Sequence, residues 1–140
     1  MTAEEANALV QALKESVRTD VFVWLHATAQ EEKFLEVGNA KNAFVLHLKR
    51  NPFEIRLHFR SLERHADLMR IDAAYRHVNP DGTEILGQPH LHVFREGYER
   101  LPWAEPIDWM DLANPMITLE RFLAEVNARF KGGFELGLDL

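Results

Sequence analysis

The chain has 140 residues, no cysteine and a formal net charge of −6, with 46% apolar and 27% charged residues. The lack of cysteine excludes disulfides, thiolate metal sites and a cysteine nucleophile, and it is typical of a reducing cytoplasm. The acidic balance argues against non-specific nucleic-acid binding, because such proteins usually neutralise phosphates with a basic surface. Length and composition predict one globular domain over residues 1–140.

The first predicted element is an amphipathic helix over residues 3–18. Thr2 is suited to cap its first turn, and Glu5 completes a capping-box pattern three residues later. Apolar residues then recur at helical spacing and predict one buried stripe: Ala6, Leu9, Val10, Leu13 and Val17. The start of the chain is acidic and the most apolar run covers only residues 21–25, so we expect no secretory signal, no membrane span and a cytoplasmic location.

Alternating apolar and polar residues predict a sheet through the middle of the chain. Residues 21–25 are β-branched or aromatic and predict a buried strand, and residues 33–37 predict a second one. Three further strands show clean alternation, at residues 44–49, 53–60 and 69–73. A period of two over such lengths indicates a sheet with one buried face and one polar face.

The second half of the chain predicts a turn, one more strand and a second helix. Asn79-Pro80-Asp81-Gly82 is a strong turn pattern, and residues 90–95 predict a strand. Residues 97–117 are expected to be irregular. Thr118 is expected to cap a helix that Gly132-Gly133 ends, and the alternating tail, residues 134–140, is a closing strand or a docking arm.

These elements together predict an α+β fold. We expect an antiparallel meander sheet of about five or six strands, packed by an N-terminal and a C-terminal helix.

The most concentrated candidate site is the pair His90 and His92, two residues apart on a predicted strand. Their side chains should share one face, with Cα atoms roughly 6.5–7 Å apart. Two imidazoles so placed can share a metal ion, or one can act as an acid and the other as a base. Zinc sites use three or four ligands, and no further ligand stands at a diagnostic offset, so structural histidines on a half-exposed strand are the competing interpretation.

Alternation also predicts a titratable face on the non-core side of the sheet. It would carry His47, Arg56, His58, Arg70, Asp72, His90 and His92. If strand pairing gathers these side chains, they suit a phosphate, a carboxylate or an RNA backbone. The alternative is a solvated sheet face with ordinary cross-strand pairs.

Four neighbouring residues are candidates for ligand binding. The turn can place His77 or Asp81 beside the histidine strand, or it can be a turn without a function. Tyr98 and Trp103 either pin a long loop to the core or form a stacking platform for a base or an apolar ligand.

The central segment resembles a family of small bacterial proteins of unknown function, found in genomes and mobile elements. The matching residues are Arg70-Ile71-Asp72, His77, Asn79-Pro80-Asp81-Gly82, Pro89-His90-Leu91-His92, Glu96-Gly97-Tyr98 and Trp103-Ala104. They correspond to the pattern R-I-D, H-x-N-P-D-G, P-H-x-H, E-G-Y and W-A-x-P, over about the central quarter of the chain. Phe94 stands where the pattern usually has Tyr, which weakens a role for a hydroxyl there. The resemblance supports the segment and the fold class and implies no reaction; the P-H-x-H strand is also similar to short motifs in toxin-like domains of toxin–antitoxin modules.

Three functions follow as hypotheses, and the sequence assigns no cofactor. The first is a non-enzymatic binding or regulatory domain, with a possible protein partner encoded nearby. The second is a metal-independent nuclease or phosphodiesterase, with His90 and His92 as acid and base. Its developing charge would be steadied by arginines, Arg56, Arg70 or Arg95. The third is a divalent-metal site at His90 and His92, completed by His77 or Asp81.

Overall fold

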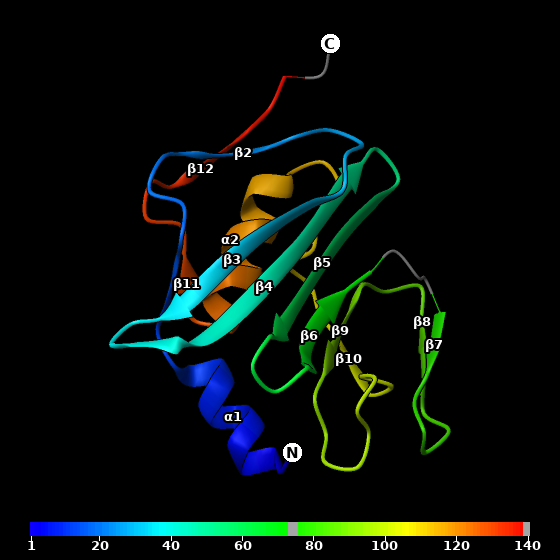
Figure 1. The fold of residues 1–140 in the computed structure, drawn as a ribbon. Helices are drawn as coiled ribbons and strands as arrows, with labels where there is room; N and C mark the ends of the chain where they lie inside the picture. The colour runs from blue at the N-terminus through cyan, green and yellow to red at the C-terminus, as the bar shows by residue number, and fades with distance from the viewer. Residues whose placement is uncertain (73–75, 139–140) are drawn as a thin grey trace.

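The computed structural model describes residues 1–72 and 76–138 (Figure 1). Within these ranges the chain forms two helices and twelve strands. In chain order they are α1 (Ala3–Gln11), β1 (Lys14–Ser16), β2 (Phe22–Trp24), β3 (Gln30–Glu36), β4 (Asn39–Asn51), β5 (Glu54–Ser61), β6 (Ala66–Ile71), β7 (Arg76–Val78), β8 (Glu84–Leu86), β9 (His90–Val93), β10 (Ala104–Pro106), α2 (Pro115–Glu125), β11 (Ala128–Arg129) and β12 (Phe134–Leu136).

The main sheet has eight strands in the order β10-β9-β6-β5-β4-β3-β1-β11. Strands β3 to β6 form the expected antiparallel meander, and β9 and β10 extend it at one edge. At the other edge β1 pairs with β11 in parallel. The fold is therefore mixed α+β with two helices and a large, mostly antiparallel sheet, but the predicted count of five or six strands is too low. The strands that were missed contain two or three residues, which is too short for an alternation pattern.

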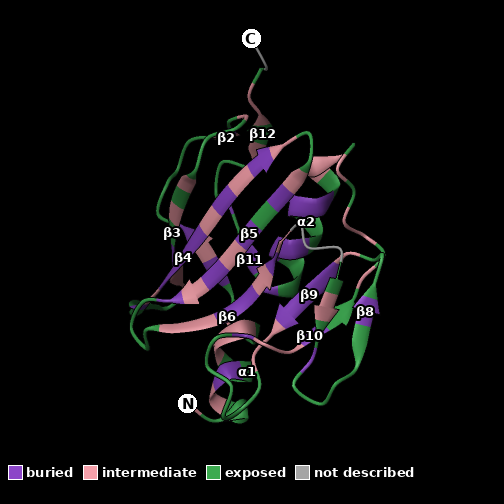
Figure 2. Cartoon of the chain, turned by 90° about the vertical axis from the view of Figure 1, so that its right-hand side faces the viewer, coloured by how far each residue is buried: buried purple, intermediate pink, exposed green. Residues whose placement is uncertain are grey.

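The core lies between the main sheet and α2, which covers one sheet face (Figure 1). Apolar residues of the long central strands point to this side and are fully or almost fully buried, among them Phe34, Phe44, Leu46, Leu57 and Phe59. Figure 2 shows the resulting bands of buried and half-buried residues along β4 and β5. The opposite face of these strands therefore carries the polar residues of the alternation.

Helix α1 is shorter than predicted. The capping box of Thr2 and Glu5 forms, but the helix ends at Gln11 and the chain continues into β1. Leu13 and Val17, assigned to the apolar stripe, are 41% and 50% exposed. These two residues lie on either side of the short strand β1, so their helical spacing does not reflect a helix.

Helix α2 begins earlier and ends earlier than predicted. Asn114 caps it in place of Thr118, since Pro115 occupies the first helical position, where its missing N–H costs nothing. The Thr118 side chain is buried inside the first turns. The helix ends at Glu125, well before Gly132-Gly133, because the chain turns at Asn127 (φ +50°) into β11.

Two small sheets complete the fold. Strand β2 pairs in parallel with β12, so the tail contributes a closing strand; its last two residues, 139 and 140, lie outside the described residues, as does residue 73 at the end of a predicted strand. In the segment predicted as a buried strand, Phe22 and Trp24 are buried, but Val21 and Leu25 are exposed. Strands β7 and β8 form a hairpin, with the predicted turn at its tip. None of the helices described is long and apolar enough to cross a membrane.

Candidate functional site

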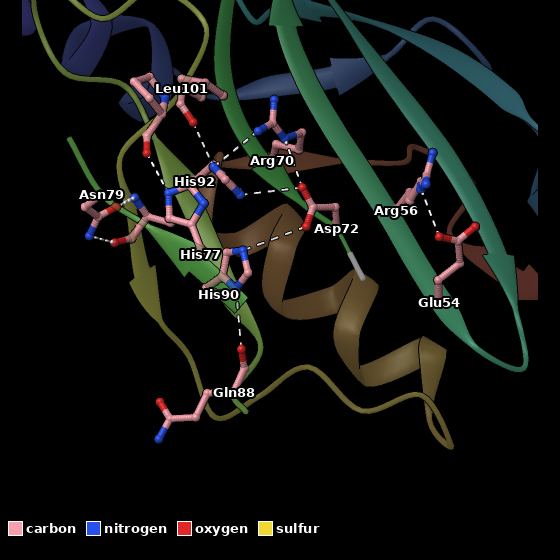
Figure 3. A network of polar contacts seen from close by, with 12 residues as sticks. Glu54, Arg56, Arg70, Asp72, His77, Asn79, Gln88, His90, His92 and Leu101 are labelled. Atoms are coloured by element: carbon pink, nitrogen blue, oxygen red, sulfur yellow. Dashed lines mark hydrogen bonds and ion pairs between the residues drawn. The ribbon is translucent and has the colours of Figure 1, made fainter. Parts of the chain in front are cut away.

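Three histidines meet where the β7–β8 hairpin packs against β9 (Figure 3). His77 comes from β7, and His90 and His92 come from β9. The ring centroids lie 5.2 Å apart for His77 and His90, 4.7 Å for His77 and His92, and 5.0 Å for His90 and His92. One ring nitrogen from each residue lies within 4.8 Å of those of the other two. Segments that are apart in the sequence thus supply one compact imidazole cluster.

The cluster is buried, which differs from the predicted half-exposed strand. His90 and His92 lie side by side, as their spacing predicts, but they are 0% and 3% exposed. The reason is that β9 lies beneath the hairpin and the loop that leads to β10, which together cover this part of the polar sheet face. Figure 2 shows β9 as buried along most of its length.

Main-chain carbonyls fix which nitrogen of each ring carries its proton. His92 Nδ1 lies 2.7 Å from the carbonyl oxygen of Leu101, and His77 Nε2 lies 2.6 Å from that of Pro102. A carbonyl oxygen only accepts, so these nitrogens must donate. His90 Nδ1 faces the carbonyl of Gln88 at a longer 3.4 Å. Each ring therefore has a lone pair on its other nitrogen, and Figure 3 shows these nitrogens turned toward the centre of the cluster.

Asp72, at the end of β6, faces two of these lone pairs. Its Oδ2 lies 3.5 Å from His92 Nε2, and its Oδ1 lies 3.8 Å from His90 Nε2. Both Nε2 atoms are buried and make no hydrogen bond to any described residue. With the ring protons held by carbonyls, the two Nε2 atoms have no proton to donate to the carboxylate, so two lone pairs face a negative charge. A cation bound between the two rings and the carboxylate would relieve this repulsion.

The electrostatics keep the His92 ring neutral. Burial lowers the pKa of His92 to about 4, with the nearby Arg70 guanidinium acting in the same direction. The His92 ring is therefore neutral at pH 7, which is the form of histidine that binds metal ions.

Arg70 also forms an ion pair with Asp72. Its Nε lies 3.4 Å from Asp72 Oδ2, and its Nη2 lies 3.2 Å from His92 Nδ1. Because His92 Nδ1 already carries the proton donated to Leu101, the second contact joins two donors and is not a hydrogen bond. The guanidinium therefore holds the carboxylate in place beside the cluster.

Asn79 was predicted only as a turn residue, and the structure gives it a second role. Its side chain is buried, donates from Nδ2 to the Ala104 carbonyl at 3.0 Å and accepts from the Ala104 N–H at 2.8 Å. This pair of bonds fastens the hairpin to β10 and so positions His77. The N-P-D-G pattern predicted the turn, and no signal in the sequence indicated the contact with β10.

Three other candidates lie outside the cluster. Asp81 is exposed at the hairpin tip, where its Oδ1 accepts from the Thr83 N–H, and this bond lowers the pKa of the Asp81 carboxyl. Tyr98 and Trp103 pack edge to face with centroids 5.8 Å apart. The Arg95 guanidinium lies 4.1 Å from the Trp103 ring centroid, so the two aromatic rings and this arginine pack together within the segment between β9 and β10.

The remaining candidates line a groove on the polar sheet face. Register pairs His47 with His58, His58 with Arg70, and Arg70 with His92, so the four side chains form a row across β4, β5, β6 and β9. Arg56 lies on the other side of Asp72 from the histidine cluster (Figure 3) and pairs with Glu54 at 3.0 Å. His58 Nε2 lies 3.0 Å from Asp67 Oδ1, and burial lowers the pKa of His58.

Comparison with known families identifies the chain. Residues 1–128 match the model of a family of unknown function, DUF6978. The chain belongs to this family. The match covers α1, α2, the whole histidine cluster and the main-sheet strands up to the first residue of β11, and the family's description supplies no activity. Searches of curated proteins and of solved structures found no match.

Proposed function

We propose that this DUF6978 protein binds a divalent transition-metal ion, with Zn²⁺ as the best fit, through His77, His90 and His92. Asp72 serves as the fourth ligand. One observation carries the proposal: three imidazoles, each oriented by a main-chain carbonyl, meet in one cluster, and the Nε2 atoms of His90 and His92, which make no hydrogen bond to any described residue, face the carboxylate of Asp72.

The distances suit a tetrahedral ion. Zinc–nitrogen bonds of ~2.0–2.1 Å place tetrahedral ligands roughly 3.3–3.4 Å apart. The Asp72 oxygens already lie 3.5 and 3.8 Å from the Nε2 atoms of His92 and His90. The nitrogens of the three rings lie within 4.8 Å of one another, so small inward side-chain rotations are enough.

The surroundings match those of known metal ligands. Metal-binding histidines usually donate their second ring N–H to a carbonyl or a carboxylate, which fixes the tautomer and the ring orientation. Leu101, Pro102 and Gln88 supply such carbonyls, and Arg70 orients the carboxylate of Asp72. A complete set of protein ligands in a buried site is typical of structural rather than catalytic zinc.

The site therefore supports a non-enzymatic binding role over a metal-independent nuclease. General acid–base catalysis requires the catalytic group to reach the reacting atom. His90 is 0% exposed and His92 is 3% exposed, so neither ring is accessible to a phosphodiester. A His92 ring with a pKa of about 4 also carries no proton to donate from Nε2 at neutral pH.

Elemental analysis of protein purified without an affinity tag tests the proposal. We expect about one zinc ion per chain. His90→Asn should remove it, because a four-ligand site loses most of its zinc affinity when one of its ligands is removed. His65→Asn is the matched control, because it removes an exposed imidazole. The backbone of this residue has φ +49°, which Asn tolerates. Protein that contains no metal and takes up none from micromolar Zn²⁺ would contradict the proposal, as would equal zinc content in the two variants.

A further inference from the structure

A groove of about 820 Å³ lies on the polar face of the main sheet, next to the histidine cluster. Its lining includes Lys49, Arg56, His58, Arg70 and Asp72, from β4, β5 and β6 and the residue that follows β6. Arg70 and Asp72 thus belong to both places: they border the groove on one side and the histidine cluster on the other (Figure 3). The volume is in the range of sites that hold small organic ligands.

The groove concentrates positive charge on an acidic protein. Its lining holds three basic side chains, Lys49, Arg56 and Arg70, against two acidic ones, Glu31 and Asp72, while the chain as a whole has a net charge of −6. Strand pairing contributes to this concentration, since Lys49 on β4 is the register partner of Arg56 on β5. Cations on neighbouring strands repel one another, and an anion bound between them would relieve the repulsion.

We propose that this groove binds a small organic phosphate, with its phosphoryl group between Arg56 and Arg70. Guanidinium groups bind phosphoryl oxygens through paired charge-assisted hydrogen bonds. The Arg56 side chain is 62% exposed and accessible to a ligand, although it now pairs with Glu54. A bare phosphate would fill only a small part of the groove, so the non-phosphate portion of the ligand lies along β4 and β5.

The proposed metal site should strengthen this binding. Arg70 is held by Asp72 at 3.4 Å, and a divalent ion bound to Asp72 would neutralise that carboxylate. The guanidinium of Arg70 would then be less compensated and would attract an anion in the groove more strongly. This coupling rests on the proposed metal site, whereas the phosphate site itself does not.

Calorimetric titration with AMP as the probe tests the groove. We expect saturable binding by the wild-type chain, weaker binding of inorganic phosphate, and a loss of about tenfold in AMP affinity in Arg56→Gln. Arg121→Gln is the matched control, since it removes a similarly exposed arginine on α2, where the pairing partner is Glu125. AMP should also shift the backbone NMR signals of β4, β5 and β6 and leave those of α2 unchanged.

The outcomes separate the two proposals. No saturation at about 10 mM AMP, equal affinities in the two arginine variants, or shifts confined to another surface would overturn the phosphate site. Equal binding of inorganic phosphate and AMP would overturn its organic character. The coupling predicts AMP affinity at least about fivefold higher in zinc-loaded, desalted protein than in chelator-treated protein, with no such gain in His90→Asn. If the wild-type chain binds no zinc, the metal site fails while the Arg56→Gln comparison still decides the groove.

Discussion

Lys14 is a fully buried lysine that joins the two helices through main-chain acceptors. Its Nζ donates to the carbonyls of Val10 and Ala12 at the end of α1 and of Val126 at the end of α2, at 2.9, 2.7 and 2.7 Å. These are carbonyls that a helix end leaves without an intrahelical partner. Burial lowers the pKa of Lys14 to about 8, so this residue links the stability of the chain to pH.

Replacement of Lys14 by Met should destabilise the chain in a pH-dependent way. At pH 7 we expect a loss of about 2 kcal/mol, because the buried carbonyls lose their donor. Between pH 8 and pH 10.5 the unfolded chain binds the proton of Lys14 more tightly than the folded chain does, so wild-type stability should rise with pH relative to Lys14→Met. Urea unfolding at several pH values measures the difference. A constant gap, or an equal effect of Lys41→Met at an exposed position, would contradict this role.

At the residue scale, the sequence predicted which side chains share a face but not how deeply they are buried. The spacing of His90 and His92 was enough to place their rings side by side. Their burial depends on carbonyls of residues 88, 101 and 102, which lie in irregular segments without a pattern. Backbone acceptors of this kind are invisible in a sequence because every residue carries one.

At the element scale, the β7–β8 hairpin is the part that makes the site. It brings His77 onto β9, and the Asn79 side chain fastens it to β10 through two hydrogen bonds to Ala104. This attachment and the bond from His77 Nε2 to the Pro102 carbonyl together position His77.

Asn79→Ala should therefore weaken zinc binding without touching a ligand. We expect a loss of about 10–100-fold in zinc affinity, the usual cost of removing support from a metal ligand. Competition between the protein and a chromophoric chelator measures it. Asp81→Ala in the same turn is the control, since Asp81 is exposed and bonds only locally to Thr83 among the described residues. Equal zinc affinity in both variants would show that the hairpin is held by other contacts.

The elements themselves were predictable where periodicity extends over many residues. Strand β5 alternates over its 8 residues and was predicted within one residue of its observed bounds, whereas the prediction of residues 44–49 covers only part of the 13-residue strand β4. The boundaries of the helices were not predicted correctly. For α1, Leu13 and Val17 continue the helical spacing by coincidence. For α2, Asn114 and Thr118 are both suitable N-caps, and Pro115 favours Asn114.

At the scale of the whole molecule, the main sheet separates two environments. One face packs against α2 and forms the core, and the other carries the row of His47, His58, Arg70 and His92 and the groove beside it. The candidate site combines the end of β6, the hairpin and β9. Its assembly depends on the pairing of β6 with β9, which skips the hairpin between them, and a single sequence does not specify such a register.

Metal binding should be visible in the stability of the whole chain. An ion that binds only the folded state adds about 4 kcal/mol at a free concentration about 1,000 times its Kd, which corresponds to roughly 10 °C in Tm at this chain length. We therefore expect a chelator to lower the Tm of the wild-type chain by about that amount and to leave the Tm of the His90→Asn variant unchanged. Differential scanning calorimetry measures both, and identical shifts in the two proteins would point to an effect of the chelator elsewhere.

X-ray absorption spectroscopy at the zinc edge tests the central claim most directly. In zinc-loaded wild-type protein we predict four nitrogen or oxygen ligands at ~2.0 Å, with the outer-shell scattering of three imidazole rings. A six-coordinate ion surrounded by water oxygens, or a spectrum that is the same in His90→Asn, would contradict a metal centre built from His77, His90, His92 and Asp72.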